Sequence, residues 1–218
     1  MAERNPEISG SSIVLRGSFN PAIFQPAWFA QQNLLAQAEA EASELKIVHP
    51  QISSFETERF VLQITTDRFV AASKPNASSE PLRDLVVGTF FILEHTPVTA
   101  IGLNRQLHFP MKSEDEWHRL GDKLAPKDGW NGVLEGRPGM RSLDILTYNA
   151  QPAGSSMMVR VQPSVLVKFG AYFETNEQYL APNNEPLKAL MQILRERWEE
   201  AQRYASKIAN HILDWANN

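Results

Sequence analysis

The most apolar stretch of the chain, residues 79–109, predicts a helix that leads directly into a long strand. Pro81 fits the first turn of a helix, where its missing N–H is no loss, and Pro97 ends the helix. Between these prolines, apolar residues recur at helical spacing on most sides, so the helix should be covered by other elements. From Val98 to Phe109 the spacing changes to two, which is typical of a strand. A chain with this stretch needs a sheet with a helix packed on it.

The predicted strand 98–109 has two unlike faces. The apolar face should lie on the core and carries Ile101, Leu103, Leu107 and Phe109. The polar face carries Gly102, Asn104, Gln106 and His108. This polar face predicts either a ligand-binding surface, with Gly102 allowing close approach, or the solvent side of an antiparallel strand.

Arg105 interrupts the apolar face of this strand between Leu103 and Leu107. A buried arginine needs a carboxylate partner or an anionic ligand, so a regular strand predicts an enclosed and paired Arg105. If the strand ends early or bulges there, the side chain is exposed instead. We take four neighbouring residues as candidate ligand-binding residues: Asn104, Arg105, Gln106 and His108.

The segment from Glu185 to Ala216 predicts one long C-terminal helix. Its apolar residues follow one another in alternating steps of three and four: Met191, Leu194, Trp198, Ala201, Ala205, Ile208, Ile212 and Trp215. Such a heptad pattern indicates either a coiled-coil seam or a stripe that covers the chain's own sheet. A helix of about 32 residues spans ~48 Å, which favours an overhang that packs on a second copy of the chain. The candidate interaction residues are Trp198, Ile208, Ile212 and Trp215.

The order of the remaining elements predicts an α+β fold in a single domain, 1–218, with a possible subdivision near 110–113. Strands are expected at 12–17, 45–49, 60–73 (a hairpin or one long strand), 140–148, 157–162 and 165–174, and further helices at 26–43 and from Ser113 to about residue 125. The first six elements have the order of a ferredoxin-like unit. The hairpin-rich second half favours an antiparallel or mixed sheet with helices packed mainly on one face, closed by the long helix 185–217.

Composition and motifs argue against most kinds of chemistry. The 218 residues include no cysteine, which excludes disulfides, thiolate metal sites and a cysteine nucleophile. GxSxG, a P-loop, GxGxxG after a strand and a pair of histidines four residues apart are all missing from the sequence. We therefore predict no catalytic residues, no metal and no cofactor. The net charge of −4 argues against nucleic acid, and the lack of long apolar runs favours a soluble, cytoplasmic protein without membrane contact.

Three segments together resemble uncharacterised bacterial proteins: residues 95–109 (HTPVTAIGLNRQLHF), 20–29 (NPAIFQPAWF) and 117–130 (WHRLGDKLAPKDGW). The resemblance covers most of the chain and implies a bacterial, cytoplasmic, single-domain protein. It brings no activity, so it assigns a role to no residue.

Three functions agree with these observations. The first is a non-catalytic binding or assembly subunit of a larger bacterial or phage-related complex, with a protein partner that could be a second copy joined through the C-terminal helix. The second is a small-ligand-binding or sensor domain that uses the polar face of strand 98–109. The third is an enzyme whose carboxylates or histidines come together only in the folded chain. A defined oligomer favours the first function, and a monomer with a deep pocket over the strand favours the others.

Overall fold

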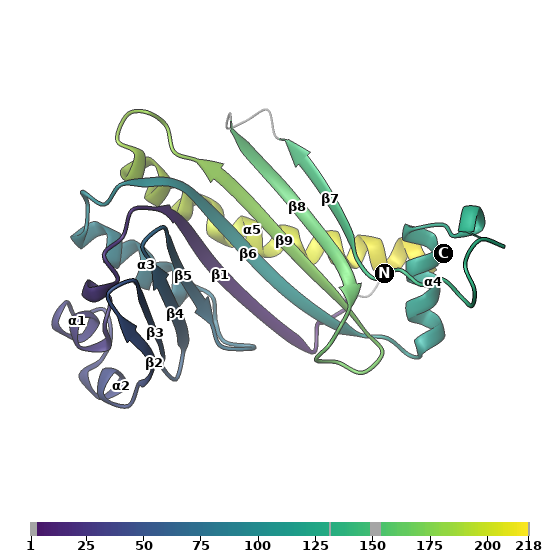
Figure 1. The fold of residues 1–218 in the computed structure, drawn as a ribbon, viewed down its shortest axis with the longest axis horizontal. Coiled ribbons are helices and arrows are strands. Elements are labelled where there is room, and N and C mark those ends of the chain that lie inside the picture. The colour runs from purple at the N-terminus through teal and green to yellow at the C-terminus, as the bar shows by residue number, and fades with distance from the viewer. Residues whose placement is uncertain (1–3, 131, 149–153, 218) are drawn as a thin grey trace.

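The protein, described as a computed structural model over residues 4–130, 132–148 and 154–217, is a single antiparallel sheet with helices on one face (Figure 1). The nine strands lie in the order β2-β3-β4-β5-β1-β6-β9-β8-β7. They are β1 (Ile8–Gly17), β2 (Glu44–His49), β3 (Ile52–Glu56), β4 (Phe60–Thr65), β5 (Arg68–Ser73), β6 (Val98–Pro110), β7 (Leu143–Tyr148), β8 (Ser155–Pro163) and β9 (Gly170–Leu180). The helices are α1 (Pro26–Gln31), α2 (Gln37–Glu41), α3 (Glu80–Ile92), α4 (Glu114–Leu124) and α5 (Pro186–Asn217), with short 3-10 turns at Pro21–Ile23 and Asp128–Trp130. The predicted α+β class is confirmed.

The predicted helix and strand of residues 79–109 are present as α3 and β6. β6 is the middle of the sheet and pairs along its length with β1 on one side and β9 on the other. β6 packs against α5 and β1 against α3, and the buried Ile13 and Leu15 of β1 belong to the same core cluster as Ile101 and Leu103 of β6. One face of the sheet is therefore the core, and the other is left without a helix.

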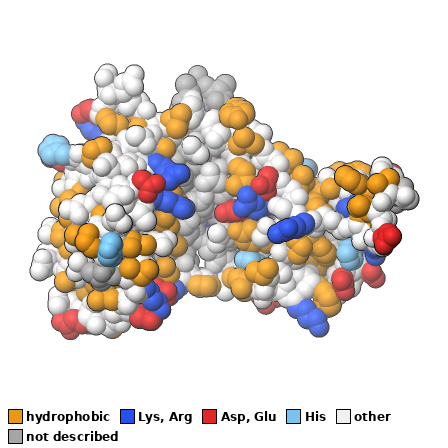
Figure 2. Space-filling model, viewed as in Figure 1, with side chains coloured by type: hydrophobic (Ala, Val, Ile, Leu, Met, Phe, Trp, Pro, Cys, Tyr) orange, Lys and Arg blue, Asp and Glu red, His pale blue; other side chains and the backbone are white. Residues whose placement is uncertain are grey.

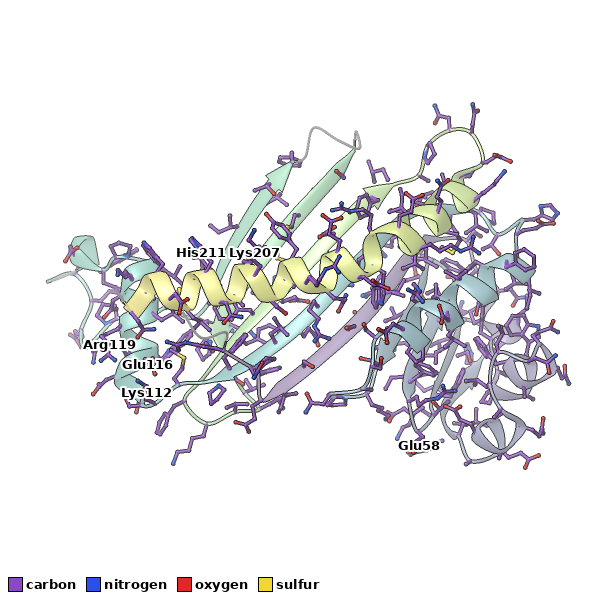
Figure 3. The ribbon with its side chains drawn as sticks, turned by 180° about the vertical axis from the view of Figure 1, so that it is seen from behind. Glu58, Lys112, Glu116, Arg119, Lys207 and His211 are labelled. Carbon is purple, nitrogen blue, oxygen red and sulfur yellow. The ribbon has the colours of Figure 1, made fainter. Side chains whose placement is uncertain are left out.

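The long helix α5 lies across the core face of its own sheet, mainly against β6 and β9 (Figure 3). It joins two clusters of buried side chains. The first lies under α3 and contains Phe69, Phe90 and Trp198. The second lies under the last turns of α5, beside α4, and contains Phe109 and Leu213. α5 packs on β6, and α4 crosses its last turns, so buried residues recur along the helix from Leu187 to Leu213.

Several elements differ from those that the sequence predicts, and β1 begins at Ile8, four residues before the expected start. The expected helix 26–43 is two short helices, because Asn33 adopts a positive φ of 57° between them, a conformation that Asn tolerates better than most residues. β9 ends at Leu180, six residues later than the expected strand end at Glu174. β3 is an additional strand, and it makes β2 to β5 a meander. β5 and β6 are joined through α3 and are both antiparallel to β1, which lies between them, and this is the arrangement of a split βαβ unit.

The described helices also bear on membrane contact. None of them is both long enough and apolar enough to cross a bilayer.

Candidate ligand-binding groove

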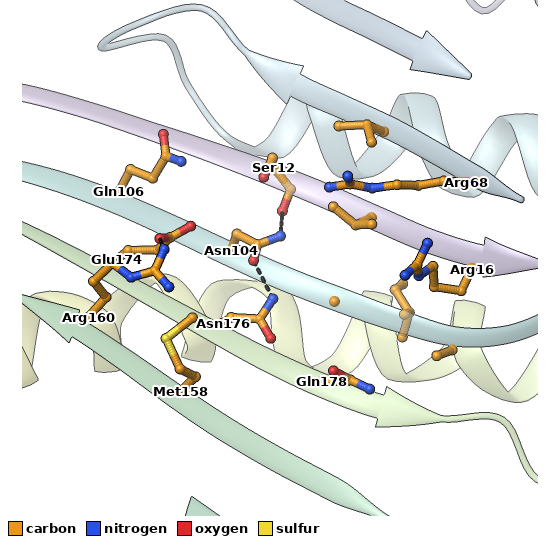
Figure 4. Close-up of a pocket in the computed structure, with 15 residues that line it drawn as sticks. Ser12, Arg16, Arg68, Asn104, Gln106, Met158, Arg160, Glu174, Asn176 and Gln178 are labelled. Atoms are coloured by element: carbon orange, nitrogen blue, oxygen red, sulfur yellow. Dashed lines mark hydrogen bonds and ion pairs between the residues drawn. The ribbon is translucent and has the colours of Figure 1, made fainter. Parts of the chain in front are cut away.

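The face of the sheet without helices is hollowed into an open groove of about 540 Å³ that crosses β5, β1, β6, β9 and β8. Figure 2 shows this hollow near the middle of the molecule, and Figure 4 shows its lining. The lining is rich in side-chain amides and arginines: Arg16, Arg68, Asn104, Gln106, Arg160, Asn176 and Gln178, with Ser12, Met158 and Glu174 among the others. We call it the amide groove.

Two amides form the floor of the amide groove. Asn104 on β6 donates a hydrogen bond from Nδ2 to the backbone oxygen of Ser12 on β1 at 3.3 Å. Asn176 on β9 donates from Nδ2 to Oδ1 of Asn104. Gly102 leaves room for this ladder, since a Cβ there would lie 3.1 Å from Nδ2 of Asn176. The ladder fixes Asn104, which is almost fully buried, so the floor is rigid across three strands.

Two further amides and two arginines line the groove and can meet a ligand. Gln106 and Gln178 form no side-chain hydrogen bond with any residue in the described part of the chain. Arg16 and Arg68 are direct cross-strand partners on β1 and β5. Arg16 pairs with the exposed Asp67 at 3.2 Å, whereas Arg68 has no ion-pair partner in the described ranges. Like charges directly opposite each other destabilise a sheet, so this end of the groove favours an anion.

The other end of the groove is already neutralised. Arg160 donates from Nε and Nη2 to the two oxygens of Asp144, both at 2.9 Å, and from Nη1 to Glu174 at 3.3 Å. These hydrogen bonds hold the pKa of Asp144 below its usual value. Burial, together with the neighbouring Glu174, raises the pKa of Tyr172. The groove therefore has one saturated end at Arg160 and one cationic end at Arg16 and Arg68.

The sequence-predicted residues of β6 are divided between different places. Asn104 and Gln106 line the amide groove. His108 lies beyond its end, where its Nδ1 is 2.8 Å from Oγ of Ser164 and its ring centroid is 4.7 Å from that of Tyr172. Burial lowers the pKa of His108, and the ring packs against Tyr172 instead of lining the groove.

Arg105 lies on the opposite, helix-covered face, as the strand pattern predicts. It is half-buried, and its Nη1 donates to Oγ of Ser11 at 2.9 Å. Ser11 in turn donates to Oε1 of Gln202 on α5 at 2.7 Å. The expected carboxylate partner is wrong: no described carboxylate forms an ion pair with Arg105, and its Nε is buried without a partner. The reason is its position between Ser11 and Thr175 in the strand pairing, where both neighbours are neutral.

This geometry changes the effect expected of a mutation at Arg105. We expect Arg105→Met to change the free energy of unfolding by less than ~1 kcal/mol or to raise it, since methionine keeps the packing and removes an unpaired, partly desolvated charge. Urea unfolding measures this difference. Leu103→Ala on the same face is the control, with an expected loss of ~2–5 kcal/mol. A loss above ~3 kcal/mol for Arg105→Met would instead indicate an acidic partner.

The candidate interaction residues of the C-terminal helix are mostly inside the chain. Trp198 is fully buried and donates from Nε1 to the backbone oxygen of Ser79 at 3.0 Å. Ile208 and Ile212 are half-buried. Trp215 is 43% exposed, and Nζ of Lys123 lies 5.1 Å from its ring centroid. Packing of the last turns on a second copy stays a prediction.

Sequence reasoning missed most of the groove lining, including Arg16, Arg68, Asn176 and Gln178. Asn176 and Gln178 lie beyond the expected strand end, because Thr175 and Glu177 are polar on the core face and hide the alternation. Glu177 is nevertheless buried there, since its Oε2 accepts from the hydroxyl of Tyr179 at 2.6 Å. That hydrogen bond and, above all, burial raise the pKa of Tyr179 to about 12.

The described ranges contain no group of three or more His, Asp or Glu residues that could hold a metal ion. No protein-family model matches the chain, and no curated protein is similar to it.

Proposed function

We propose that the protein is a non-catalytic, cytoplasmic binding subunit of a larger bacterial or phage-related complex, and that the amide groove holds an extended acidic segment of a partner protein. The observation that carries this proposal is the cross-strand pair Arg16 and Arg68 at the end of a groove floored by amides. Glu174 is the one carboxylate in the lining, and it pairs with Arg160. The groove therefore offers a ligand the hydrogen bonds of its amides and the positive charge of Arg16 and Arg68.

The chemistry of the lining selects the class of ligand. Amide side chains present both donors and acceptors, as a peptide backbone does. Guanidinium groups bind carboxylates through paired hydrogen bonds. The groove is open and runs over five strands, which suits an extended segment better than a small molecule, since small ligands are usually enclosed on most sides. A small anionic ligand at Arg16 and Arg68 is the second candidate.

Selection from a displayed library of random peptides on the immobilised protein tests the proposal. We expect enriched sequences to be extended, polar and acidic. Calorimetric titration of a selected peptide then locates the site, because binding should weaken when Gly102 is replaced by leucine, which fills the floor of the groove beside Asn176. Enrichment of basic or purely apolar peptides contradicts the proposal. So does a peptide affinity that is the same for Gly102→Leu as for the wild type. Binding of small anions alone would favour the second candidate.

Arg68→Gln should separate affinity from stability. Loss of a charge-assisted hydrogen bond worth ~1.5–3 kcal/mol predicts about a 10- to 100-fold weaker affinity for the selected acidic peptide. Stability should stay within ~0.5 kcal/mol or rise, because the repulsion between Arg68 and Arg16 is relieved. The measurements are calorimetric titration and urea unfolding of the same protein preparation.

A matched control comes from the solvent side of α5, where Arg203 is exposed. Arg203→Gln removes the same charge from the chain far from the groove, so it should leave the peptide affinity unchanged. If both variants weaken binding equally, the effect comes from net charge, and the site is not the groove.

A further inference from the structure

The two edges of the sheet are unlike. β2 has charged residues at Glu44 and Lys46, and its pairing with β3 shifts between Leu45 and Ile47. Lysines and bulges of this kind keep an edge strand from pairing with another chain. β7 has neither: its six residues pair with β8 without a register shift, from Leu143 to Tyr148, and include no Lys or Pro. In the part of the chain that the structure describes, no strand pairs with the outer side of β7, so this edge can accept an added strand.

β7 exposes large apolar side chains on both faces. Ile145 points to the helix side and Leu146 to the groove side, and the two are 52% and 51% exposed. Tyr148 is 82% exposed. In both ribbon views the strand lies at the margin of the sheet, away from the helices that cover the opposite half (Figures 1 and 3). Large apolar side chains on an edge strand are a binding surface or an aggregation hazard.

The charge of this edge is already cancelled inside the chain. Asp144 is the one charged residue of β7, and both its oxygens accept hydrogen bonds from Arg160 at 2.9 Å. A charged partner strand would find no opposite charge to pair with. A strand of the same sequence meets no repulsion, because its own Asp144 is neutralised in the same way.

We propose that β7 pairs antiparallel with β7 of a second copy of the chain, so that the sheet continues through a two-fold dimer. A two-fold axis perpendicular to the sheet keeps each face of the strand on the same side in both copies. Leu146 and Tyr148 of one copy then pack beside the same residues of the other, and Ile145 does so on the opposite face. The two amide grooves open on the same side of the dimer. This dimer does not depend on the proposed function.

Light scattering and sedimentation equilibrium of the full chain test the dimer. We expect a dimer for the wild type and a monomer for Leu146→Lys, with a dimer dissociation constant at least about tenfold higher and an unchanged circular dichroism spectrum. Leu45→Lys on the β2 edge, where the leucine is 55% exposed, is the matched control and should leave the dimer intact. A monomeric wild type, or a dimer that Leu146→Lys does not weaken, overturns the proposal.

Cross-linking locates the interface, because the chain has no cysteine of its own. Paired residues of antiparallel strands have Cα atoms about 4.5–5.5 Å apart, within reach of a disulfide. Single cysteines at positions 145 and 146, in Ile145→Cys and Leu146→Cys, should give a covalent dimer on oxidation in at least one case, whereas Leu45→Cys should not. If only Trp215→Cys cross-links, the copies meet through α5 and the β7 interface is wrong.

Discussion

Replacing Trp198 by alanine is expected to lower the free energy of unfolding by about 3–5 kcal/mol. Trp198 is the largest fully buried side chain, and it touches both α3 and the sheet from the middle of α5. The variant also leaves the backbone oxygen of Ser79 without the indole N–H that it accepts at 3.0 Å. Urea unfolding followed by circular dichroism measures the loss.

Trp215→Ala is the matched control, since it removes the same side chain from the same helix. Its ring is 43% exposed and contacts Lys123, so the expected loss is about 0.5–1 kcal/mol, in the range of an exposed cation–π pair. Equal losses for both variants would mean that the last turn of α5 is as buried as its middle. That result would contradict the exposed fractions of the two tryptophans.

Local patterns were sufficient for the elements whose signals lie within a few residues. The change of period at Pro97 separates α3 from β6, and the acidic first turn after Ser113 begins α4. Ser113 accepts from the backbone N–H of Glu116 at 3.3 Å, as a capping box requires. The return bond differs, because Glu116 accepts from the backbone N–H of Lys112 at 2.6 Å instead of from Ser113.

Elements that depend on contacts between residues far apart in the chain were missed. β3 contains Ser53 and Ser54, and its inward Ser53 reads as a loop residue until its hydroxyl is seen to donate to the backbone oxygen of Phe24 at 2.6 Å. The same holds for the groove. The polar face of β6 could be predicted from its alternation, but Arg16 and Arg68 become neighbours only through the pairing of β1 with β5. Five strands form the groove, so its composition depends on which strands pair in the sheet, and a local pattern does not contain that information.

The residues that α5 buries distinguish a coiled-coil repeat of about 3.5 residues per turn from the roughly 3.6 residues per turn of a straight helix. A coiled-coil seam would continue from Ala205 to Ile208, Ile212 and Trp215. The fully buried residues are instead Ala209 and Leu213, so the stripe proceeds from Ala201 in steps of four. A straight helix drifts by about 20° per heptad relative to a seam, and a sheet beneath it buries whichever residues that drift turns downward. The burial pattern is that of a helix lying on its own sheet.

Leu213→Ala is therefore expected to cost about 2–5 kcal/mol of unfolding free energy, as for other fully buried leucines, although this residue lies four positions from the end of α5. A chain that ends at Lys207 should lose more, because it also lacks Ala209 and Asn210, whose Oδ1 accepts from the backbone N–H of Arg4 at 2.8 Å. Ile208→Ala, at a half-buried position of the expected seam, should cost less than Leu213→Ala.

The same variants distinguish two roles for the end of α5: packing on its own sheet, or packing on a second chain. If the end of α5 covers its own sheet, Leu213→Ala lowers stability and leaves the oligomeric state in light scattering as it is in the wild type. If the end is a seam between two chains, Ile208→Ala lowers the stability of the dimer more than Leu213→Ala does, and unfolding becomes dependent on protein concentration through that residue. The complete burial of Leu213 beside the half-burial of Ile208 favours the first result, since the side chain that loses most contact with water contributes most to folding.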